Sequence, residues 1–347
     1  MKRTISAAVA LAAASTLALS GCATKKTDAS GGGDQGSTDV TIMVGGMSKI
    51  IYLPAALTQQ LGYFKQQGLN VNLVDTPAGV TAETALIANQ AQGVVGFYDH
   101  TIDMQAKGKC LESVVQFANV PGEAEVVSKD AESSVTNPAG FKGKKLGVTS
   151  AGSSTDFLTQ YLAGRAGVTT SQYTTVKAGA DSTFIAALKT GGIDAGMTTD
   201  PTIAKITQGD MGKVMVDMRT EDGTKQALGG LYPASSLYVS CDYVANNKAT
   251  VQKLANAFVK TLKFVDSHSA AEIAEKMPAD YKGSDPDLYV KAIGDSIGMF
   301  NGNGVMNADG AKNVLTVLGS FSAAVKPKKD SIDVAKTYTT EFAEAAK

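Results

Sequence analysis

The chain has 347 residues, of which 44% are hydrophobic and 19% charged, so its length favours a folded protein with two lobes or domains. Its 32 Lys and Arg against 33 Asp and Glu give a net charge of −1, which argues against a general nucleic-acid binder. Two histidines and three cysteines provide little material for a transition-metal site.

The first residues have the pattern of an export signal. A short basic segment precedes an apolar run at 7–19, which is too short to span a bilayer and has the length of a signal-peptide core. The run ends in Leu-Ser-Gly-Cys22, which resembles the lipobox of bacterial lipoproteins. Residues 1–21 are therefore predicted to be a lipoprotein signal peptide, with Cys22 lipidated. Ordinary signal cleavage, with Cys22 as an incidental thiol, is the alternative.

The next segment, 22–39, is rich in Gly, Ser, Thr, Asp and Lys and is predicted to be a flexible tether. A doubly lipidated Cys22 at its start would hold the protein at the membrane. The folded part is expected to begin near Val40 and to lie outside the cytoplasm, anchored to the membrane without spanning it.

Strands and helices are predicted to alternate through the two thirds of the chain that follow. The first group has strands at 40–44, 70–74, 94–97 and 111–117, with helices at 53–67 and 81–92. The same order returns with strands at 145–149, 174–176 and 193–197 and helices at 156–166 and 182–190. A strand at 237–240 precedes an amphipathic helix at 251–265 and further helices at 288–300, 308–318 and 334–346.

This order predicts two α/β lobes, each a mainly parallel sheet flanked by helices. The chain is expected to cross between the lobes near 125–130 and to return near 233–237. This assigns 40–127 and 235–347 to the first lobe and 128–234 to the second. Ligands of open α/β sheets bind at the carboxyl ends of the strands, so two facing lobes predict a cleft.

A small-residue turn follows strand 145–149. Gly152 allows close approach of another group, and Ser153, Ser154 and Thr155 lead into the next helix. Free N–H groups at a helix start carry partial positive charge and suit a carboxylate, sulfonate or phosphate. Ligand contact is one interpretation of these residues, and a plain helix cap is the other.

Further candidates follow the carboxyl ends of the other strands. They are Ser48 and Tyr52 after the first strand, Thr76 after the second, Tyr98, Asp99 and His100 after the third, and Thr199 and Asp200 after strand 193–197. Each fits ordinary turn chemistry, but their shared location favours a ligand site. The adjacent acid and imidazole of Asp99 and His100 have no accompanying nucleophile motif, which leaves ligand hydrogen bonding or a turn role. No metal or cofactor is expected.

Two cysteines remain beyond the tether. Cys110 precedes the fourth strand and Cys241 follows strand 237–240, so both belong to the first lobe. Outside the cytoplasm such a pair forms either a disulfide or two buried thiols, and the sequence leaves both open.

Several segments together resemble the substrate-binding proteins of ABC transporters, in the branch of taurine, alkanesulfonate, nitrate and thiamine-pyrimidine-precursor binders. They are 62–71 (GYFKQQGLNV), 143–148 (GKKLGV) with the turn at 152–155, 186–195 (AALKTGGIDA), and Asp200-Pro201, which stands where "EP" is common. The resemblance covers roughly residues 40–270.

The resemblance implies a type II periplasmic-binding-protein-like clamp that closes on a small molecule. The expected protein is a monomeric, non-catalytic lipoprotein that delivers a sulfonate, an aromatic carboxylate or a heterocycle to a membrane permease and its ATPase. It also implies that Ser153, Ser154 and Thr155 hold the polar end of the ligand.

Two departures matter. Family members often have small residues where this chain has Tyr98, Asp99 and His100, and an acid there would repel an anion unless His100 or a proton offsets it. The aromatic residue common before "EP" is here Thr199. Two alternatives stay open: an enzyme of the thiamine-pyrimidine-precursor type on the same fold, although this chain lacks the cysteine cluster which that activity needs, and a receptor that senses a solute without transport.

Overall fold

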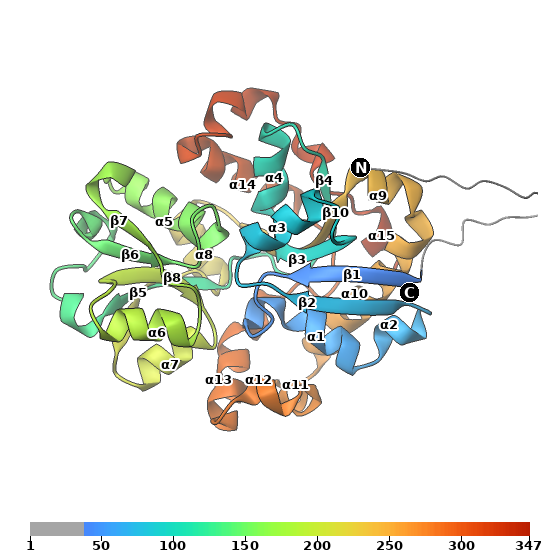
Figure 1. Ribbon diagram of the computed structural model, residues 1–347, viewed down its shortest axis with the longest axis horizontal. Coiled ribbons are helices and arrows are strands. Elements are labelled where there is room, and N and C mark those ends of the chain that lie inside the picture. Colours follow the sequence, from blue (N-terminus) through green and yellow to red (C-terminus); the bar gives the residue numbers. More distant parts are fainter. Residues whose placement is uncertain (1–37) are drawn as a thin grey trace, which may run out of the picture. The chain divides into compact units, whose positions relative to one another are not determined.

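The computed structural model describes residues 38–347, so the predicted signal peptide, Cys22 and nearly all of the tether lie outside the described residues. The described part is built on two five-stranded sheets (Figure 1). No helix within it combines the length and the apolar character needed to cross a bilayer.

The first sheet has the strand order β2-β1-β3-β10-β4. Its strands are β1 (Asp39–Val44), β2 (Asn70–Asp75), β3 (Gly93–Phe97), β4 (Leu111–Gln116) and β10 (Ser235–Ser240). Strand β1 is parallel to β2 and β3, whereas β10 is antiparallel to both of its neighbours. Because β10 arrives from the far end of the second lobe, the first lobe is assembled from two separate stretches of chain.

The second sheet repeats this plan in the order β7-β6-β8-β5-β9. Its strands are β5 (Glu123–Ser128), β6 (Lys145–Val148), β7 (Thr174–Lys177), β8 (Ala195–Thr199) and β9 (Gly212–Asp217). Here β5 is the antiparallel strand, pairing with β8 and β9. The predicted fold class, two lobes with mainly parallel sheets, is confirmed.

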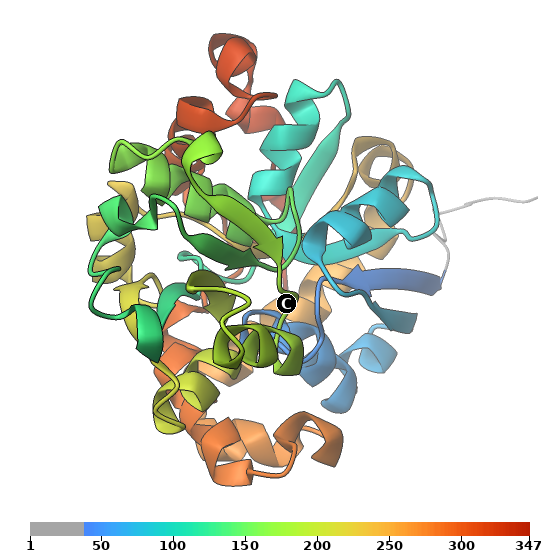
Figure 2. The same ribbon diagram turned by 60° about the vertical axis from the view of Figure 1, so that its left-hand side comes forward.

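Helices cover both faces of each sheet (Figures 1 and 2). In the first lobe α3 (Gly79–Ile87) and α4 (Asp99–Ala106) lie on one face, and α1 (Leu53–Gln60), α2 (Tyr63–Gln66) and α10 (Lys248–Ser267) lie on the other. In the second lobe α5 (Ser154–Arg165) and α8 (Glu221–Leu228) lie opposite α6 (Ser182–Lys189) and α7 (Thr202–Gln208).

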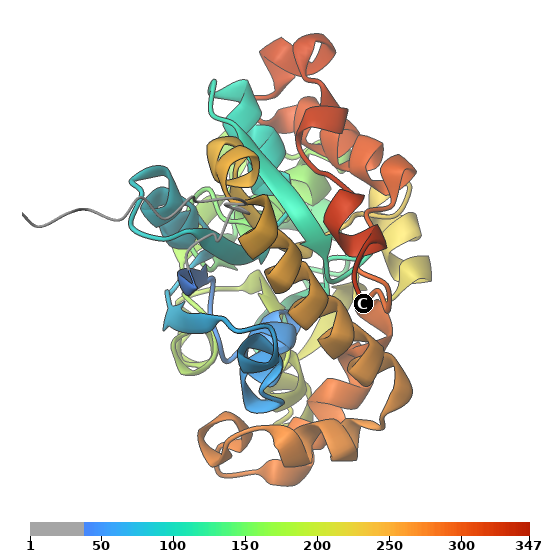
Figure 3. The same ribbon diagram turned by 90° about the vertical axis from the view of Figure 1, so that its right-hand side faces the viewer.

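The remaining helices follow β10. They are α9 (Cys241–Asn246), α11 (Ala270–Lys276), α12 (Ala279–Lys282), α13 (Pro286–Ser296), α14 (Ala308–Phe321) and α15 (Glu341–Glu344). Figure 3 shows α10 lying along the first lobe, where it contacts α1, α2 and α15. The apolar stripe predicted for 251–265 is buried along α10.

Short 3-10 turns complete the chain. They are η1 (Ile50–Tyr52), η2 (Lys129–Ala131), η3 (Pro138–Phe141), η4 (Thr170–Gln172), η5 (Ile297–Met299), η6 (Lys326–Ser331) and η7 (Val334–Lys336). The helix predicted at 334–346 is therefore wrong in extent, because only η7 and α15 form there. The helix predicted at 53–67 is interrupted by Gly62, whose φ of 71° is left-handed and separates α1 from α2.

The chain passes between the lobes at 117–122 and again at 229–234. The first crossing comes earlier than the expected 125–130, because β5 already belongs to the second sheet. All six residues of β5 are buried, including Glu123 and Glu125. Two glutamates at the start of a strand made this segment resemble a solvated linker in the sequence.

Cys110 and Cys241 form a disulfide, with their Cα atoms 5.5 Å apart. One cysteine precedes β4 and the other begins α9, so the bond lies within the first lobe. The 131-residue separation between them spans the whole second lobe and both crossings.

Candidate functional site

A small enclosed cavity lies between the lobes, at the carboxyl ends of the parallel strands. It measures about 10 Å³, which is about the room that one water molecule needs. The side chains and glycine that line it are Lys49, Tyr52, Gly79, Phe97, His100, Glu123, Thr149, Ser153, Ser154 and Thr155. All of them are buried. This is the closed arrangement of the two lobes, with both sheets contributing their edge to one site.

Three buried polar atoms of this lining have no hydrogen-bond partner among the described residues. They are Nε2 of His100, Oε2 of Glu123 and Oγ of Ser153. Buried polar groups are nearly always hydrogen-bonded, and leaving one unpaired destabilises the fold by about 1–3 kcal/mol. Three such atoms around one cavity make it the candidate site for a polar molecule.

His100 lies in the first turn of α4 and forms an ion pair with Glu83 of α3, with 2.7 Å between Nδ1 and Oε2. Burial lowers the pKa of His100, but the Glu83 carboxylate, together with smaller contributions from Asp99 and Asp103, raises it to about 9. The ring is therefore protonated at neutral pH. Because Nδ1 faces Glu83, the Nε2–H group is left to donate a hydrogen bond into the cavity.

Besides His100 and Glu83, a second pair of basic and acidic side chains, Lys49 and Glu123, lies at the cavity. The Lys49 ammonium donates a hydrogen bond to the Gly45 carbonyl at 2.8 Å, and burial lowers its pKa to about 8 while Glu123 and Asp75 oppose the change. Burial raises the pKa of Glu123, and Lys49 partly offsets this. Glu123 reaches the cavity because β5 starts at the edge of the second sheet where β8 ends.

Asp99 lies directly behind the cavity wall, and both of its carboxylate oxygens are occupied. One accepts a hydrogen bond from Ser154 Oγ at 2.8 Å, and the other accepts from the hydroxyl of Tyr232 at 2.9 Å. Burial is the main cause that raises the pKa of Asp99. These contacts join α4 of the first lobe, α5 of the second lobe and the second crossing.

The turn between β6 and α5 holds the serines in place. Gly152 has a φ of 78°, which favours glycine, and its N–H donates to Asp156. Thr155 Oγ1 accepts a hydrogen bond from the Thr149 N–H at 3.0 Å. Ser153 precedes the helix without a side-chain cap bond, and it lines the cavity. Gly152 lines a different hollow, beside α3 and α4.

The structure brings five of the predicted site residues to the cavity: Tyr52, His100, Ser153, Ser154 and Thr155. Three others of the first lobe lie elsewhere. Thr76 donates to the Val44 carbonyl, Tyr98 pairs with the hydroxyl of Thr337, and Ser48 is exposed beside a separate groove.

Thr199 and Asp200 also lie away from the cavity. Thr199 donates to the carbonyl of its neighbour, and the Asp200 carboxylate accepts hydrogen bonds from Arg219 at 3.0 Å and from Ser296 at 2.8 Å. The Asp200 carbonyl accepts a further bond from the Ile50 N–H. Asp200 therefore joins the end of β8 to α13 and η1.

The sequence prediction did not include Lys49, Gly79, Phe97, Glu123 and Thr149 among the site residues. Lys49 follows β1 in the same loop as Ser48, so its position was available in the sequence. Glu123 required knowledge that β5 joins the second sheet. The partner Glu83 is on α3, seventeen residues from His100, and no sequence pattern connects the two.

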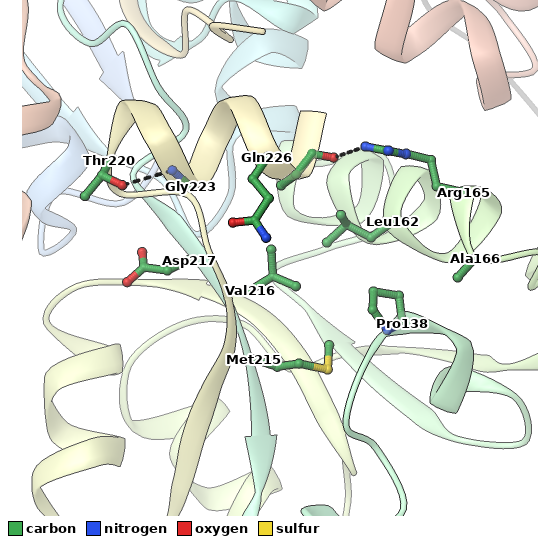
Figure 4. Close-up of a pocket in the computed structure, with 11 residues that line it drawn as sticks. Pro138, Leu162, Arg165, Ala166, Met215, Val216, Asp217, Thr220, Gly223 and Gln226 are labelled. Atoms are coloured by element: carbon green, nitrogen blue, oxygen red, sulfur yellow. Dashed lines mark hydrogen bonds between the residues drawn. The ribbon is translucent and has the colours of Figure 1, made fainter. Parts of the chain in front are cut away.

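A larger hollow of about 510 Å³ lies wholly in the second lobe, beside α5, α8 and β9 (Figure 4). Its lining is mixed, with apolar Leu162, Met215 and Val216 beside polar side chains such as Asp217 and Gln226. Arg165 donates to the Ala227 carbonyl at 2.6 Å. None of the buried polar atoms without a partner lines this hollow, so the cavity between the lobes is the better candidate site. Residues 38–347 contain no cluster of His, Cys, Asp and Glu that could hold a metal ion.

Comparisons with known proteins support the fold and identify the family. A family model described as "NMT1/THI5 like" matches residues 52–271. A solved structure from Bordetella bronchiseptica RB50 is 34% identical, covers 89% of this chain and 96% of its own, and has a TM-score of 0.85.

Two further relatives carry functional names. The alkanesulfonate-binding protein SsuA from Xanthomonas axonopodis pv. citri, solved bound to MOPS, has a TM-score of 0.71 at 18% identity, covering 88% of this chain and 99% of that one. The 4-amino-5-hydroxymethyl-2-methylpyrimidine phosphate synthase of Aspergillus parasiticus is 28% identical over 258 residues, 69% of this chain and 70% of that protein. The family match spans more than half of the sequence, and the chain belongs to the NMT1/THI5-like family.

Proposed function

We propose that the protein is the extracytoplasmic solute-binding component of an ABC importer, which captures a small polar organic molecule between its lobes and delivers it to the permease. The observation that carries this proposal is the enclosed cavity with three unpartnered polar atoms. The likeness to an alkanesulfonate-binding protein supports it. The lipobox-like segment supports attachment to the membrane through Cys22.

Capture requires the lobes to separate, because the cavity is closed off by residues of both. The two crossings, 117–122 and 229–234, are the only covalent links between the lobes within the described residues. Two such links suit a hinge that opens to admit the ligand and closes around it. The contacts of Asp99 with Ser154 and of Asp200 with Ser296 would form as the lobes close.

Ligand binding to the refolded protein tests the proposal. The protein is unfolded and refolded to remove bound solute and is then screened by thermal shift against alkanesulfonates, nitrate, aromatic carboxylates, pyrimidines and flavins. A ligand at a thousand times its Kd stabilises the fold by about 4 kcal/mol. Ser153→Ala is expected to weaken binding of the hit, because Ser153 lines the cavity and its hydroxyl has no hydrogen-bond partner among the described residues.

Ser150→Ala is the matched control, since Ser150 lies in the same turn but not on the cavity. Equal affinity of the two variants would argue against this cavity as the binding site. Absence of any hit, together with no co-purifying small molecule by native mass spectrometry, would argue against a binding protein.

One observation favours a second candidate function, an enzyme of the thiamine-pyrimidine-precursor type. It is the 28% identity with the Aspergillus parasiticus synthase. Within the described residues both cysteines are joined in the disulfide, so no free thiol is present near the cavity. Mass spectrometry of the purified protein incubated with candidate substrates decides, because turnover yields a new product mass and binding alone does not.

A further inference from the structure

We propose that Arg219 stabilises the closed arrangement of the lobes from beside the hinge, by holding the Asp200 carboxylate where it binds Ser296 of the first lobe. Arg219 is a positioning residue in this role, because it does not line the cavity. The inference rests on the lobe movement that the proposed function requires. It goes beyond that function, because its test needs no solute.

The first observation concerns the first crossing, which is hydrogen-bonded to both lobes. On the first-lobe side its Asn119 N–H donates at 3.1 Å to the carbonyl of Met299 in η5, which continues α13. Helix α13 packs against α11 and η1 of the first lobe and also reaches α7 of the second (Figure 1). On the second-lobe side the Gly122 N–H donates at 3.1 Å to the carbonyl of Met218, the residue before Arg219. The end of α13 and the segment that carries Arg219 therefore flank the same crossing.

The second observation is that Asp200 joins these two segments. Its Oδ2 accepts a hydrogen bond from Arg219 Nη1 at 3.0 Å and another from the hydroxyl of Ser296, the last residue of α13, at 2.8 Å. Its Oδ1 accepts from the Ala204 N–H at 3.1 Å, so the carboxylate is also held by its own lobe. The Asp200 carbonyl accepts from the Ile50 N–H of η1 at 3.0 Å. One residue of the second lobe thus contacts two segments of the first.

The third observation is that Arg219 is itself fixed within its own lobe. Its Nε and Nη2 donate to the two carboxylate oxygens of Asp217 at 3.0 and 2.6 Å, a two-pronged contact that orients the planar guanidinium. This leaves Nη1 for Asp200 and, at 3.8 Å, for the carboxylate of Asp295 on α13. The side chain is 13% exposed, so water screens these contacts little. Arg219 therefore holds the same oxygen of Asp200 that Ser296 contacts.

The burial of Asp200 makes this pairing matter most in the closed form. Its side chain is fully buried, and a buried charge without a partner is strongly disfavoured. Opening the lobes would break the bonds from Ser296 and Ile50 and let water reach the carboxylate. Without Arg219, the unpaired charge would therefore destabilise the closed form more than the open form. If the protein captures a solute as proposed, its affinity would fall by the same factor as the closed fraction.

Amide hydrogen exchange in D2O, followed by NMR on the refolded protein without added solute, tests the inference. The reporter is the Ile50 N–H, whose bond to the Asp200 carbonyl joins the two lobes. The reference is the Gly45 N–H in the preceding loop, which donates to the Val95 carbonyl within the first lobe. Faster exchange of the reporter alone therefore measures opening of the lobes, whereas faster exchange of both amides measures unfolding of the first lobe.

The variants are Arg219→Gln, Ser296→Ala and their combination. Arg165→Gln is the matched control, because Arg165 is the other arginine among residues 38–347 and its hydrogen bond to Ala227 stays within the second lobe. Arg219→Gln is expected to accelerate exchange of the Ile50 N–H at least about tenfold, because breaking a buried ion pair disfavours the closed form. The control should leave both amides unchanged. Ser296→Ala should accelerate the reporter alone but add little in the combination, because without Arg219 the carboxylate oxygen is no longer held for it.

Exchange of the Ile50 N–H at the wild-type rate in Arg219→Gln overturns the inference. So does an equal acceleration of the reference amide or an equal effect of the control, since either indicates general destabilisation. Fully additive effects of the two substitutions also overturn it. If Arg219→Gln does not fold, Arg219→Lys takes its place, because lysine keeps the charge but not the two-pronged contact with Asp217, and the same outcomes decide. Exchange needs no ligand, so a ligand screen without any hit would remove the proposed function and leave this inference standing.

Discussion

His100 owes its chemistry to one neighbour. The ring is buried, and burial alone would favour the neutral form, yet the Glu83 carboxylate 2.7 Å away holds it charged. The pair thus fixes both the charge and the donor atom that His100 presents to the cavity.

Glu83→Gln is expected to lower the pKa of His100 from about 9, because burial would then be opposed only by the smaller contributions of Asp99 and Asp103. The measurement is an NMR titration of the ring protons. The chain has only two histidines, and His268 on the far end of α10 serves as the internal control. An unchanged titration of His100 in the variant would contradict the ion pair.

The same pair makes stability depend on pH, with a definite sign. Because the pKa is about 9 in the folded state and 6.5 in the unfolded chain, the pair stabilises fully below pH 6.5. This contribution, about 3 kcal/mol, is lost as the pH rises from 6.5 through 9. The stability difference between the wild-type protein and Glu83→Gln should therefore shrink over that window.

Individual site residues were predictable only where they follow a recognisable strand. His100, Ser153, Ser154 and Thr155 come directly after β3 and β6, so their location at the cleft could be read from the sequence. Glu83 acts through a tertiary contact between α3 and α4, and no local pattern predicts it. Tyr98 shows the opposite error, a predicted site residue that does not line the cavity. It follows β3 as expected, but its hydroxyl pairs with the hydroxyl of Thr337.

Among the elements, the turn from β6 into α5 does most to position the site. It places Ser153 and Ser154 on the cavity, and a buried hydrogen bond from the Thr149 N–H to Thr155 Oγ1 closes it. Both residues of this bond are buried.

Thr155→Val is expected to destabilise the fold by about 1–3 kcal/mol, because it keeps the side-chain shape but leaves the Thr149 N–H without an acceptor. Thr155→Ser retains the oxygen and should recover most of that loss. Urea denaturation at fixed pH measures both variants. Equal destabilisation by valine and serine would indicate a packing role for the methyl group instead of the hydrogen bond.

Elements with a strong local pattern were predicted well, and those set by tertiary contacts were not. The stripe at 251–265 lies within α10, because seven apolar side chains at helical spacing leave no other arrangement. In contrast, the sequence prediction places the crossing at 125–130, where the structure has most of β5, a strand whose two glutamates are buried. Their burial depends on Lys49 and Thr159, which the local sequence does not reveal.

At the scale of the molecule, the second lobe is an insertion into the first. Residues 117–234 leave the first lobe after β4 and return to it at β10. The disulfide joins the two flanks of this insertion, Cys110 and Cys241. The first sheet is therefore held together covalently at the point where its two chain segments meet.

Replacing both cysteines with serine is expected to lower the free energy of unfolding by about 2–5 kcal/mol, because the bond closes a long loop in the unfolded chain. Urea denaturation with and without a reducing agent provides the measurement. Reductant should bring the wild-type protein to the stability of the double variant and should leave the variant unchanged. A wild-type protein indifferent to reductant would show that the bond does not form.

The disulfide also determines how the molecule transmits tension. A pull applied between the two ends of the folded part runs from β1 to Cys110, crosses the sulfur–sulfur bond to Cys241 and continues through α10 to the last helix. Residues 111–240 lie outside this path and do not carry the tension. Because neither crossing lies on this path, tension between the two ends of the folded part does not act on the hinge proposed above.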